Sequence, residues 1–299
     1  MTRSYGWLLA FLAAVWGASY LFIKVAVDEL EPTAMMFIRT SVAGLMLLPF
    51  VLTRFDDGGR RLRSAWRPGL VLGIINAAVP FTLIAWGEKH IDSGVAGVAN
   101  ATVPLFVVLL ALRFSPSQRV GGARLAGILV GLVGVAVLAG GQPGGGWWAI
   151  AGTLAVVLAS LSYAGGGLYG GARTADTPGP VLATASMFGG ALVLAPFAAL
   201  QFPREVPSWE TVASVAALTV LGTAVAQIVL FRMLRLHGAA RATLVTYLLP
   251  PAALLYGAVL LDERITVAAL IGLALILPGV ALGSGAFRPG RRAAASQSP

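Results

Sequence analysis

Seven aromatic and amide side chains are the residues of this sequence best suited to bind a small polar molecule, because each lies within a long apolar segment. An aromatic ring can stack on an apolar or aromatic group, and an amide can hydrogen-bond an amino or carboxylate group. Inside a membrane such side chains face the interior of a helix bundle, since exposure to lipid is costly. For each amide the alternative is a structural bond to a neighbouring helix. The seven candidate substrate-binding residues are Trp16, Tyr20, Asn76, Asn100, Tyr163, Gln227 and Tyr247.

A second set of residues is suited to movement. Pro80, Pro104 and Pro250 fall inside apolar segments, where proline removes a backbone hydrogen bond and kinks a helix. Gly166 is the centre of a run of three glycines that weakens another segment. Arg39 lies about two turns inside its segment, where a charge is expensive, so we expect it to meet a partner acid or to form a gate. These five are the candidate gating residues.

Several classes of chemistry are excluded or disfavoured by what the sequence lacks. It has no Cys and only two His, so thiolate metal sites and cysteine nucleophiles are excluded, and we expect no metal and no cofactor. No HExxH or GxSxG sequence and no dense cluster of acids and His occurs, so we do not expect an enzyme. No Asp or Glu lies near the middle of an apolar segment, which predicts gradient-driven transport without an embedded carboxylate proton relay.

The elements that must position these residues are membrane spans. Of the 299 residues 58% are hydrophobic and 11% are charged, against roughly 45–50% and about 25% in soluble domains. A spanning helix needs about 20 mostly apolar residues. The sequence therefore predicts an all-α integral membrane protein with ten transmembrane helices. The ten segments are approximately 7–27, 32–52, 68–87, 92–113, 120–140, 148–170, 180–200, 211–232, 240–260 and 266–286.

Polar residues are not spread evenly over these segments. The first, third, fourth, sixth, eighth and ninth carry nearly all of them, and the other four are almost bare. We expect the first group to line a cavity and the second to scaffold it. Lys24, near the end of the first segment, is expected to snorkel to the interface or to pair with Asp28 or Glu31.

The basic residues indicate orientation and location. Most of the 21 Lys and Arg residues fall on one side of the predicted topology, which places both termini in the cytoplasm. The net charge of +9 is then explained by anionic membrane lipid, and nucleic-acid binding is not expected. The excess of Arg (19) over Lys (2) points to a GC-rich bacterial genome and hence to a bacterial inner membrane. Residues 287–299 read as a disordered cytoplasmic tail.

The chain also resembles itself at an offset of about 145 residues. Pro104 aligns with Pro250, and residues 117–120 (SQRV) align with 262–265 (DERI). Each half, 1–140 and 147–286, holds five predicted spans, an odd number, so the second half must be inverted relative to the first. Inverted repeats are typical of secondary transporters. The small-residue pairs in the fifth and tenth segments predict close packing within a monomer.

Three stretches resemble a known family. Residues 16–24 (WGASYLFIK), 247–250 (YLLP) and 261–264 (LDER) are similar to motifs of the drug/metabolite transporter superfamily, in its ten-helix EamA-type branch, and the resemblance covers about residues 7 to 285. It departs at Gln118, where the first repeat of that family often carries a glutamate. The resemblance implies export of small metabolites, with amino acids, including aromatic ones, as a prominent substrate class.

Together these features predict a small-molecule exporter that works by alternating access. A cavity of amides, hydroxyls and aromatic rings suits a neutral or aromatic amino acid better than a phosphorylated substrate, which usually demands Arg or Lys. The alternative is a broad-specificity exporter of drugs or other metabolites. A passive channel is the remaining class, and saturable flux with counterflow would separate it from a carrier.

Overall fold

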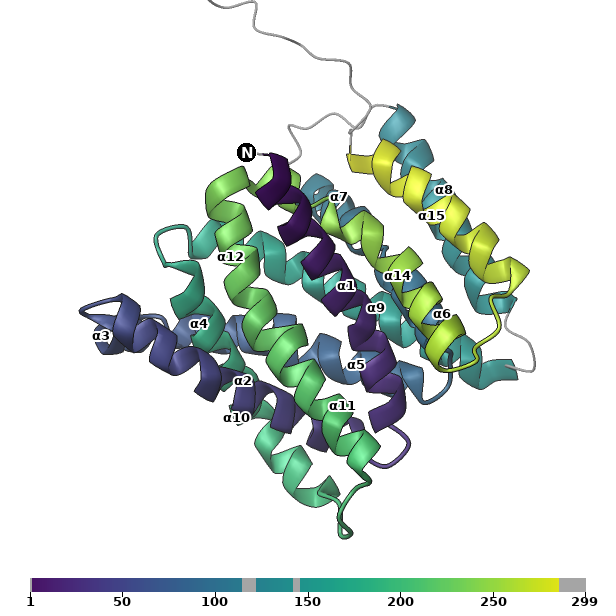
Figure 1. The fold of residues 1–299 in the computed structure, drawn as a ribbon. Helices are drawn as coiled ribbons and strands as arrows, with labels where there is room; N and C mark the ends of the chain where they lie inside the picture. Colours follow the sequence, from purple (N-terminus) through teal and green to yellow (C-terminus); the bar gives the residue numbers. More distant parts are fainter. Residues whose placement is uncertain (1, 115–121, 142–145, 285–299) are drawn as a thin grey trace, which may run out of the picture.

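The computed structural model describes residues 2–114, 122–141 and 146–284, and these residues form helices without strands (Figure 1). Eight helices are long and apolar enough to cross a membrane, and two further apolar helices, Val245–Leu260 and Val267–Gly283, are shorter. The predicted all-helical membrane architecture is confirmed for this part of the chain, whereas the count of ten spans and the side of each terminus remain predictions. Gln118, the stretch 117–120 and the predicted tail 287–299 lie outside the described residues.

The N-terminal half contains one continuous rod with a change of helix type and one broken helix. The rod runs from Trp66 to Glu88 through α4, η1 and α5, and the break separates α6 from α7 at Ala101 and Thr102. The elements are α1 (Thr2–Ala26), α2 (Pro32–Arg54), α3 (Gly58–Ser64), α4 (Trp66–Gly73), η1 (Ile74–Ala78), α5 (Val79–Glu88), α6 (Ser93–Asn100), α7 (Val103–Phe114) and α8 (Gly122–Gly140).

The C-terminal half repeats this plan with different boundaries. The continuous rod runs from Trp209 to His237, and the short α13 precedes α14. The ninth segment, predicted to begin at residue 240, is broken: its long part starts only at Val245. The elements are α9 (Gly146–Arg173), α10 (Gly179–Gln201), α11 (Trp209–Thr219), η2 (Val220–Val225), α12 (Ala226–His237), α13 (Ala239–Ala242), α14 (Val245–Leu260) and α15 (Val267–Ser284).

Both rods contain a stretch of π-helix, η1 and η2, at mid-length. A π turn disturbs the regular ladder of backbone hydrogen bonds, and in hydrocarbon no water can replace a lost partner. Side chains supply the missing donors here. The Ser162 hydroxyl of α9 donates to the Ile75 carbonyl at 2.6 Å, and the Trp16 indole N–H of α1 donates to the Gly222 carbonyl at 3.2 Å. Each π turn is thus satisfied by the first long helix of the other half.

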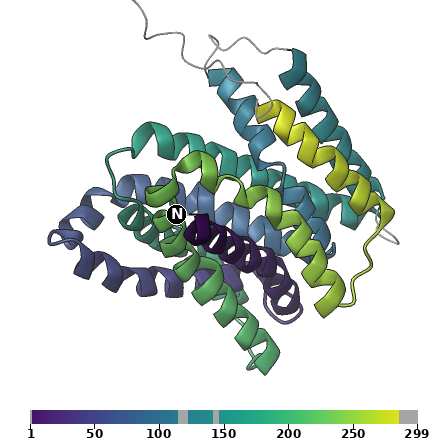
Figure 2. The same ribbon diagram turned by 45° about the horizontal axis from the view of Figure 1, so that its top comes forward.

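Glycine lets several helices approach at backbone contact. A Cβ placed on Gly73 of α4 would lie 2.4 Å from the Gly190 nitrogen of α10, and one on Gly127 of α8 would lie 2.6 Å from the Gly283 nitrogen of α15. The pair α8 and α15 forms one edge of the bundle, apart from the helices around α1 (Figures 1 and 2). The small residues of the fifth and tenth segments therefore pack against each other within one chain.

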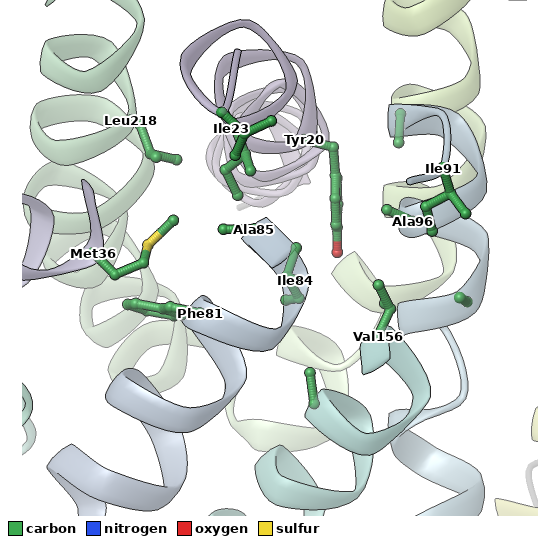
Figure 3. Packing of buried hydrophobic residues seen from close by; sticks show 14 of the residues in the cluster. Tyr20, Ile23, Met36, Phe81, Ile84, Ala85, Ile91, Ala96, Val156 and Leu218 are labelled. Atoms are coloured by element: carbon green, nitrogen blue, oxygen red, sulfur yellow. The ribbon is translucent and has the colours of Figure 1, made fainter. Parts of the chain in front are cut away.

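A hydrophobic core fills the space where α1, α2, α5 and α11 meet (Figure 3). Ile23 and Ile84 project from α1 and α5 into it, and Phe81 lies beside Met36. Tyr20 extends from α1 toward α6. This core surrounds the cavity described below and fixes the helices that line it.

Replacing Gly127 with Ala tests the close contact between α8 and α15. The new methyl group meets backbone atoms that cannot rotate away, so we expect a loss of roughly 1–3 kcal/mol in stability, the usual cost of overpacking. The thermal unfolding midpoint of the purified protein in detergent measures it. Gly122→Ala on the same helix is the matched control, because nothing lies within 4 Å of its Cβ position. Equal midpoints for the two variants would contradict the packing.

Candidate substrate cavity

A cavity of about 350 Å³ lies in the middle of the bundle. This volume falls in the range of roughly 300–1,000 Å³ that small-molecule sites occupy. Its walls come from both halves of the chain: the N-terminal half contributes residues of α1, α2, η1, α5, α6 and α7, and the C-terminal half contributes residues of α9, α10, η2, α12 and α14. Six of the seven predicted substrate-binding residues line it: Trp16, Tyr20, Asn76, Asn100, Tyr163 and Gln227.

The seventh, Tyr247, is not among the residues that line this cavity. It packs against the main hydrophobic cluster, whereas its neighbours Thr246 and Leu249 face the cavity from α14. Of the predicted gating residues, Arg39 and Pro104 line the cavity. Pro80 and Pro250 are buried outside it, and Gly166 contacts it only through Asn76. Whether these residues bind substrate or act as gates remains a prediction.

The expected division between lining and scaffolding segments needs one correction. The fifth and tenth segments, α8 and α15, contribute no lining residue. The second and seventh do contribute: α2 supplies Arg39, and α10 supplies Ser186 and Met187. The helix α2 lines the cavity through one charged residue, Arg39, so the number of polar residues in a segment did not predict whether that segment lines the cavity.

A chain of hydrogen bonds connects three of the helices around the cavity. Ser160 of α9 donates its hydroxyl to Asn100 Oδ1 at 3.1 Å, and Asn100 Nδ2 donates to the Tyr20 hydroxyl at 2.7 Å. Asn100 ends α6, so its amide bridges α1 and α9 at the point where the helix breaks before α7. Tyr20 is left with a phenolic proton that can be offered to a molecule in the cavity.

Arg39 is the charged residue of the cavity wall. Its Nε donates to Thr223 Oγ1 at 2.9 Å, and its guanidinium carbon lies 3.8 Å from the centre of the Phe81 ring. The ion pairs among the described residues, Arg60–Asp57, Arg61–Asp57 and Lys89–Glu31, do not include it. The expected partner acid is therefore not found within ion-pair distance in this part of the chain. An aromatic face and a hydroxyl hold the guanidinium in place and leave its charge for another anion.

Asn76 lies on η1 and is pressed against α9. Its Oδ1 is buried without a hydrogen-bond partner among the described residues, and a Cβ added to Gly166 would lie 2.0 Å from it. The glycine at position 166 therefore makes room for this amide. Gly165, next in the chain, has open space at its Cβ position.

Beyond the cavity, toward the end of α5, the structure corrects the expectation for Lys24. Its Nζ is not within ion-pair distance of Asp28 or Glu31. It donates to the backbone carbonyl of Glu88, the last residue of α5, at 2.7 Å and to that of Ile91, in the turn after the helix, at 3.0 Å. Glu31 instead pairs with Lys89 at 2.9 Å.

Glu88 is a buried residue that the sequence analysis missed. The third segment was predicted to end at residue 87, but the helix continues to Glu88, whose side chain is 0% exposed. Glu88 lies at the end of the helix, so the prediction that no acid lies near mid-span still holds, but the sequence analysis did not consider a sealed carboxyl at a helix end. The sequence signal available was the i, i+4 spacing from Ile84, which places Glu88 on the same face of the helix as an apolar residue.

Glu263, from the LDER stretch, has a structural role in this arrangement. Its Oε1 accepts the backbone N–H of Ser93 at 2.7 Å, and its Oε2 accepts the Ser93 hydroxyl at 2.9 Å and the Gly94 N–H at 3.1 Å. A carboxylate is favoured at a helix N-terminus, where backbone donors are free. Glu263 therefore anchors the start of α6, the helix that ends at Asn100.

Phe81, whose ring packs against the guanidinium of Arg39, is a second residue that the sequence analysis missed. A search for polar residues cannot find an apolar ring.

Known proteins match the chain over nearly its whole length. The profile of the EamA-like transporter family matches residues 4–140 and again 150–284. The chain is 30% identical to the uncharacterized inner membrane transporter YedA of Escherichia coli strain K12, over 91% of this chain and 87% of that protein. A protein of Streptantibioticus cattleyicolor named probable terminal-alkyne amino-acid exporter is also 30% identical, over 92% of each chain. A crystal structure with 22% identity has the same fold, with a TM-score of 0.65 over 95% of this chain and 97% of that one.

The contact between Gly166 and Asn76 can be tested with a double-mutant cycle. We expect Gly166→Ala to lower stability at the lower end of the roughly 1–3 kcal/mol of overpacking, because the Asn76 amide can partly rotate away. Asn76→Ala in the same chain should abolish that loss, since it removes the clashing atom. Thermal unfolding midpoints measure both effects. Gly165→Ala is the control and should not lower the midpoint; additive losses for Gly166→Ala and Asn76→Ala would argue against the contact.

Proposed function

The chain belongs to the EamA-like transporter family, and from this membership we propose that it exports neutral or aromatic amino acids across the bacterial inner membrane. It is a multi-pass membrane transporter of that family. Relatives with amino-acid names support the substrate class: the Streptantibioticus protein, and an Escherichia coli protein named probable amino-acid metabolite efflux pump, which is 23% identical over 94% of each chain. The inner membrane is the location in the printed name of YedA.

The observation that carries this proposal is the guanidinium of Arg39 in the wall of the central cavity. It is held by Thr223 and Phe81, and no ion pair with an acid of the described residues occupies it. A guanidinium binds a carboxylate through two parallel hydrogen bonds. The α-carboxylate of an amino acid supplies that group, so Arg39 is assigned a binding role in addition to the gating role predicted from the sequence.

The other lining residues suit the rest of an amino acid. The rings of Trp16 and Tyr163 can pack against an aromatic or apolar side chain, and the amides of Asn76, Asn100 and Gln227 offer acceptors for the α-ammonium group. Among the described residues, no Asp or Glu lines the cavity. A molecule with a second positive charge would therefore bind without compensation, which favours neutral substrates. Tyr247 is kept as a candidate that reaches substrate in another conformation.

Transport is proposed to occur by alternating access of two inverted five-helix repeats, 1–140 and 147–286, with both termini in the cytoplasm. The paired π turns support this division. Trp16 and Ser162, which satisfy the two turns, are separated by the same offset as Pro104 and Pro250. In the proposed cycle the breaks near Pro104 and before Pro250 and the space at Gly166 allow the two halves to exchange conformations, and Pro80 lies directly after the first π turn.

Counterflow tests the function. Liposomes containing the purified protein and excess unlabelled compound are given labelled L-phenylalanine, L-leucine, L-lysine, a nucleoside or a quaternary ammonium dye. We expect saturable counterflow of phenylalanine and leucine and little of lysine, because the cavity lacks an acid for a second ammonium group. Counterflow of the dye alone would establish the broad-specificity drug exporter instead, and linear, non-saturating flux would indicate a channel.

A variant of Arg39 tests its role as the carboxylate site. Hydrogen bonds to a charged group contribute about 1.5–3 kcal/mol, so Arg39→Met should weaken the apparent affinity for phenylalanine by roughly tenfold or more. Phenylethylamine, which lacks the carboxylate, should compete equally well in the variant and the wild type. Competition assays in the same liposomes measure both. Arg54→Met, an exposed residue of the same helix, is the control; equal weakening for the two ligands would mean that Arg39 only holds the fold.

A further inference from the structure

A second cavity, of about 530 Å³, differs from the central one in that half of its lining residues are charged. We call it the charged cavity; its lining includes Lys24, Asp28, His90, Asp92, Glu263 and Arg264. The two cavities adjoin a common wall. On α1, Ile23 lines the central cavity and Lys24 the charged one; on and after α5, Ile84 lines the central cavity and Ile91 the charged one.

Glu88 lies inside this wall, between Ile84 and Ile91 in the chain. Its side chain is fully buried, and neither carboxyl oxygen has a hydrogen-bond partner among the described residues. An unpartnered buried carboxyl of this kind is an energetic liability that a structural role does not explain.

The ionisable groups around Glu88 come from several elements. Tyr20 and Lys24 of α1, Arg39 of α2 and Glu263 of the connection between α14 and α15, which caps α6, lie near enough to interact electrostatically with Glu88. Tyr163 of α9 interacts electrostatically with Tyr20 and Arg39, and these two residues interact with Glu88. The helix α6 itself carries no ionisable side chain. Two cations are thus near Glu88, and neither forms an ion pair with its carboxylate.

Lys24 uses its donors elsewhere. Its ammonium group donates to the carbonyl of Glu88, the last residue of α5, and to that of Ile91 in the turn that follows, and so links α1 to the end of α5. A charged carboxylate at this site would compete with those carbonyls for Lys24, whereas a neutral carboxyl would not. A buried carboxylate that accepts no hydrogen bonds also has a high desolvation free energy, and protonation of the carboxylate removes the charge that causes it.

We propose that Glu88 is a proton-binding site and that its occupancy controls the wall between the central and charged cavities. With the proton bound, the carboxyl is neutral and Lys24 holds the end of α5, as in this structure. When the O–H bond breaks and the proton passes to water in the charged cavity, the carboxylate draws Lys24 from the two carbonyls and the wall loosens. The ligand of the site is a proton alone, and the step involves no change of oxidation state.

The charged cavity offers a route for that proton. Asp92 precedes α6 and lines this cavity, and burial together with the neighbouring Glu263 carboxylate raises the pKa of Asp92, while Lys24 opposes the shift. A carboxyl whose pKa is raised toward neutrality is better matched to proton transfer than an ordinary Asp. The proton path therefore leads away from the substrate cavity, which has no acid in its lining.

The protonation state can be tested without any transported compound, by infrared difference spectroscopy of the reconstituted protein. The wild type should show, at neutral pH, the carbonyl band of a protonated carboxyl that is missing in Glu88→Gln. Glu88→Asp should restore such a band. Glu31→Gln, an exposed acid on the neighbouring connection, is the matched control and should leave the band unchanged. A wild-type spectrum in which Glu88→Gln removes no such band would overturn the proposal.

The coupling rests on the proposed amino-acid transport and is tested separately. An imposed pH gradient should drive phenylalanine in wild-type liposomes above equilibrium. Glu88→Gln, which mimics the protonated form, should lose this accumulation but keep counterflow at equal pH, and Glu88→Asp should retain it. Accumulation that persists in Glu88→Gln, or counterflow without gradient-driven accumulation in the wild type, would refute the coupling. Absence of any phenylalanine flux would refute the proposed substrate, and the infrared result would then decide the proton site alone.

Discussion

The need to satisfy every backbone polar group inside hydrocarbon is the constraint on which this structure depends. The two π turns, η1 and η2, bring polar atoms to the centre of the bundle but disturb the helical ladder at mid-length. Ser162 and Trp16 supply the donors, and both come from the opposite half of the chain. The halves therefore cross at the π turns, and the central cavity forms at this crossing. Each half thus supplies a hydrogen-bond donor that the cavity-forming turn of the other half uses.

The two halves share their order of helices and a π turn at mid-length of one rod, but their charged residues do not match. At the offset that relates Pro104 to Pro250, the positions matching Lys24, Arg39 and Glu88 are Gly170, Ala185 and Leu234. The cations and the buried acid thus belong to the N-terminal half, and the C-terminal half contributes small or apolar residues at the matching positions. A ligand shifts a conformational equilibrium only if it binds the two conformations with different affinity. Charges confined to one half can give a substrate anion or a proton such a difference in affinity.

Glu263 shows how a motif can serve the site from a distance. It lies in the connection between α14 and α15 and makes three hydrogen bonds to the start of α6, at Ser93 and Gly94. The helix α6 is eight residues long, so fixing its start also fixes the position of Asn100 at its end. The amide of Asn100 is hydrogen-bonded to Tyr20 and Ser160. The acid of the LDER stretch therefore orients a cavity amide without lining the central cavity.

The sequence alone determined which segments are apolar, that they are helices, and which polar residues lie within them, because hydropathy and segment length follow from composition over a short window. It therefore identified Trp16, Asn100 and Gln227 as residues of the central cavity. The side of a helix that each residue presents was settled by the packing of the helices, which places Thr246 but not Tyr247 in the cavity wall. The partners of Lys24 and the burial of Glu88 were also decided there. These features depend on contacts between residues more than sixty positions apart, and no local pattern encodes such contacts.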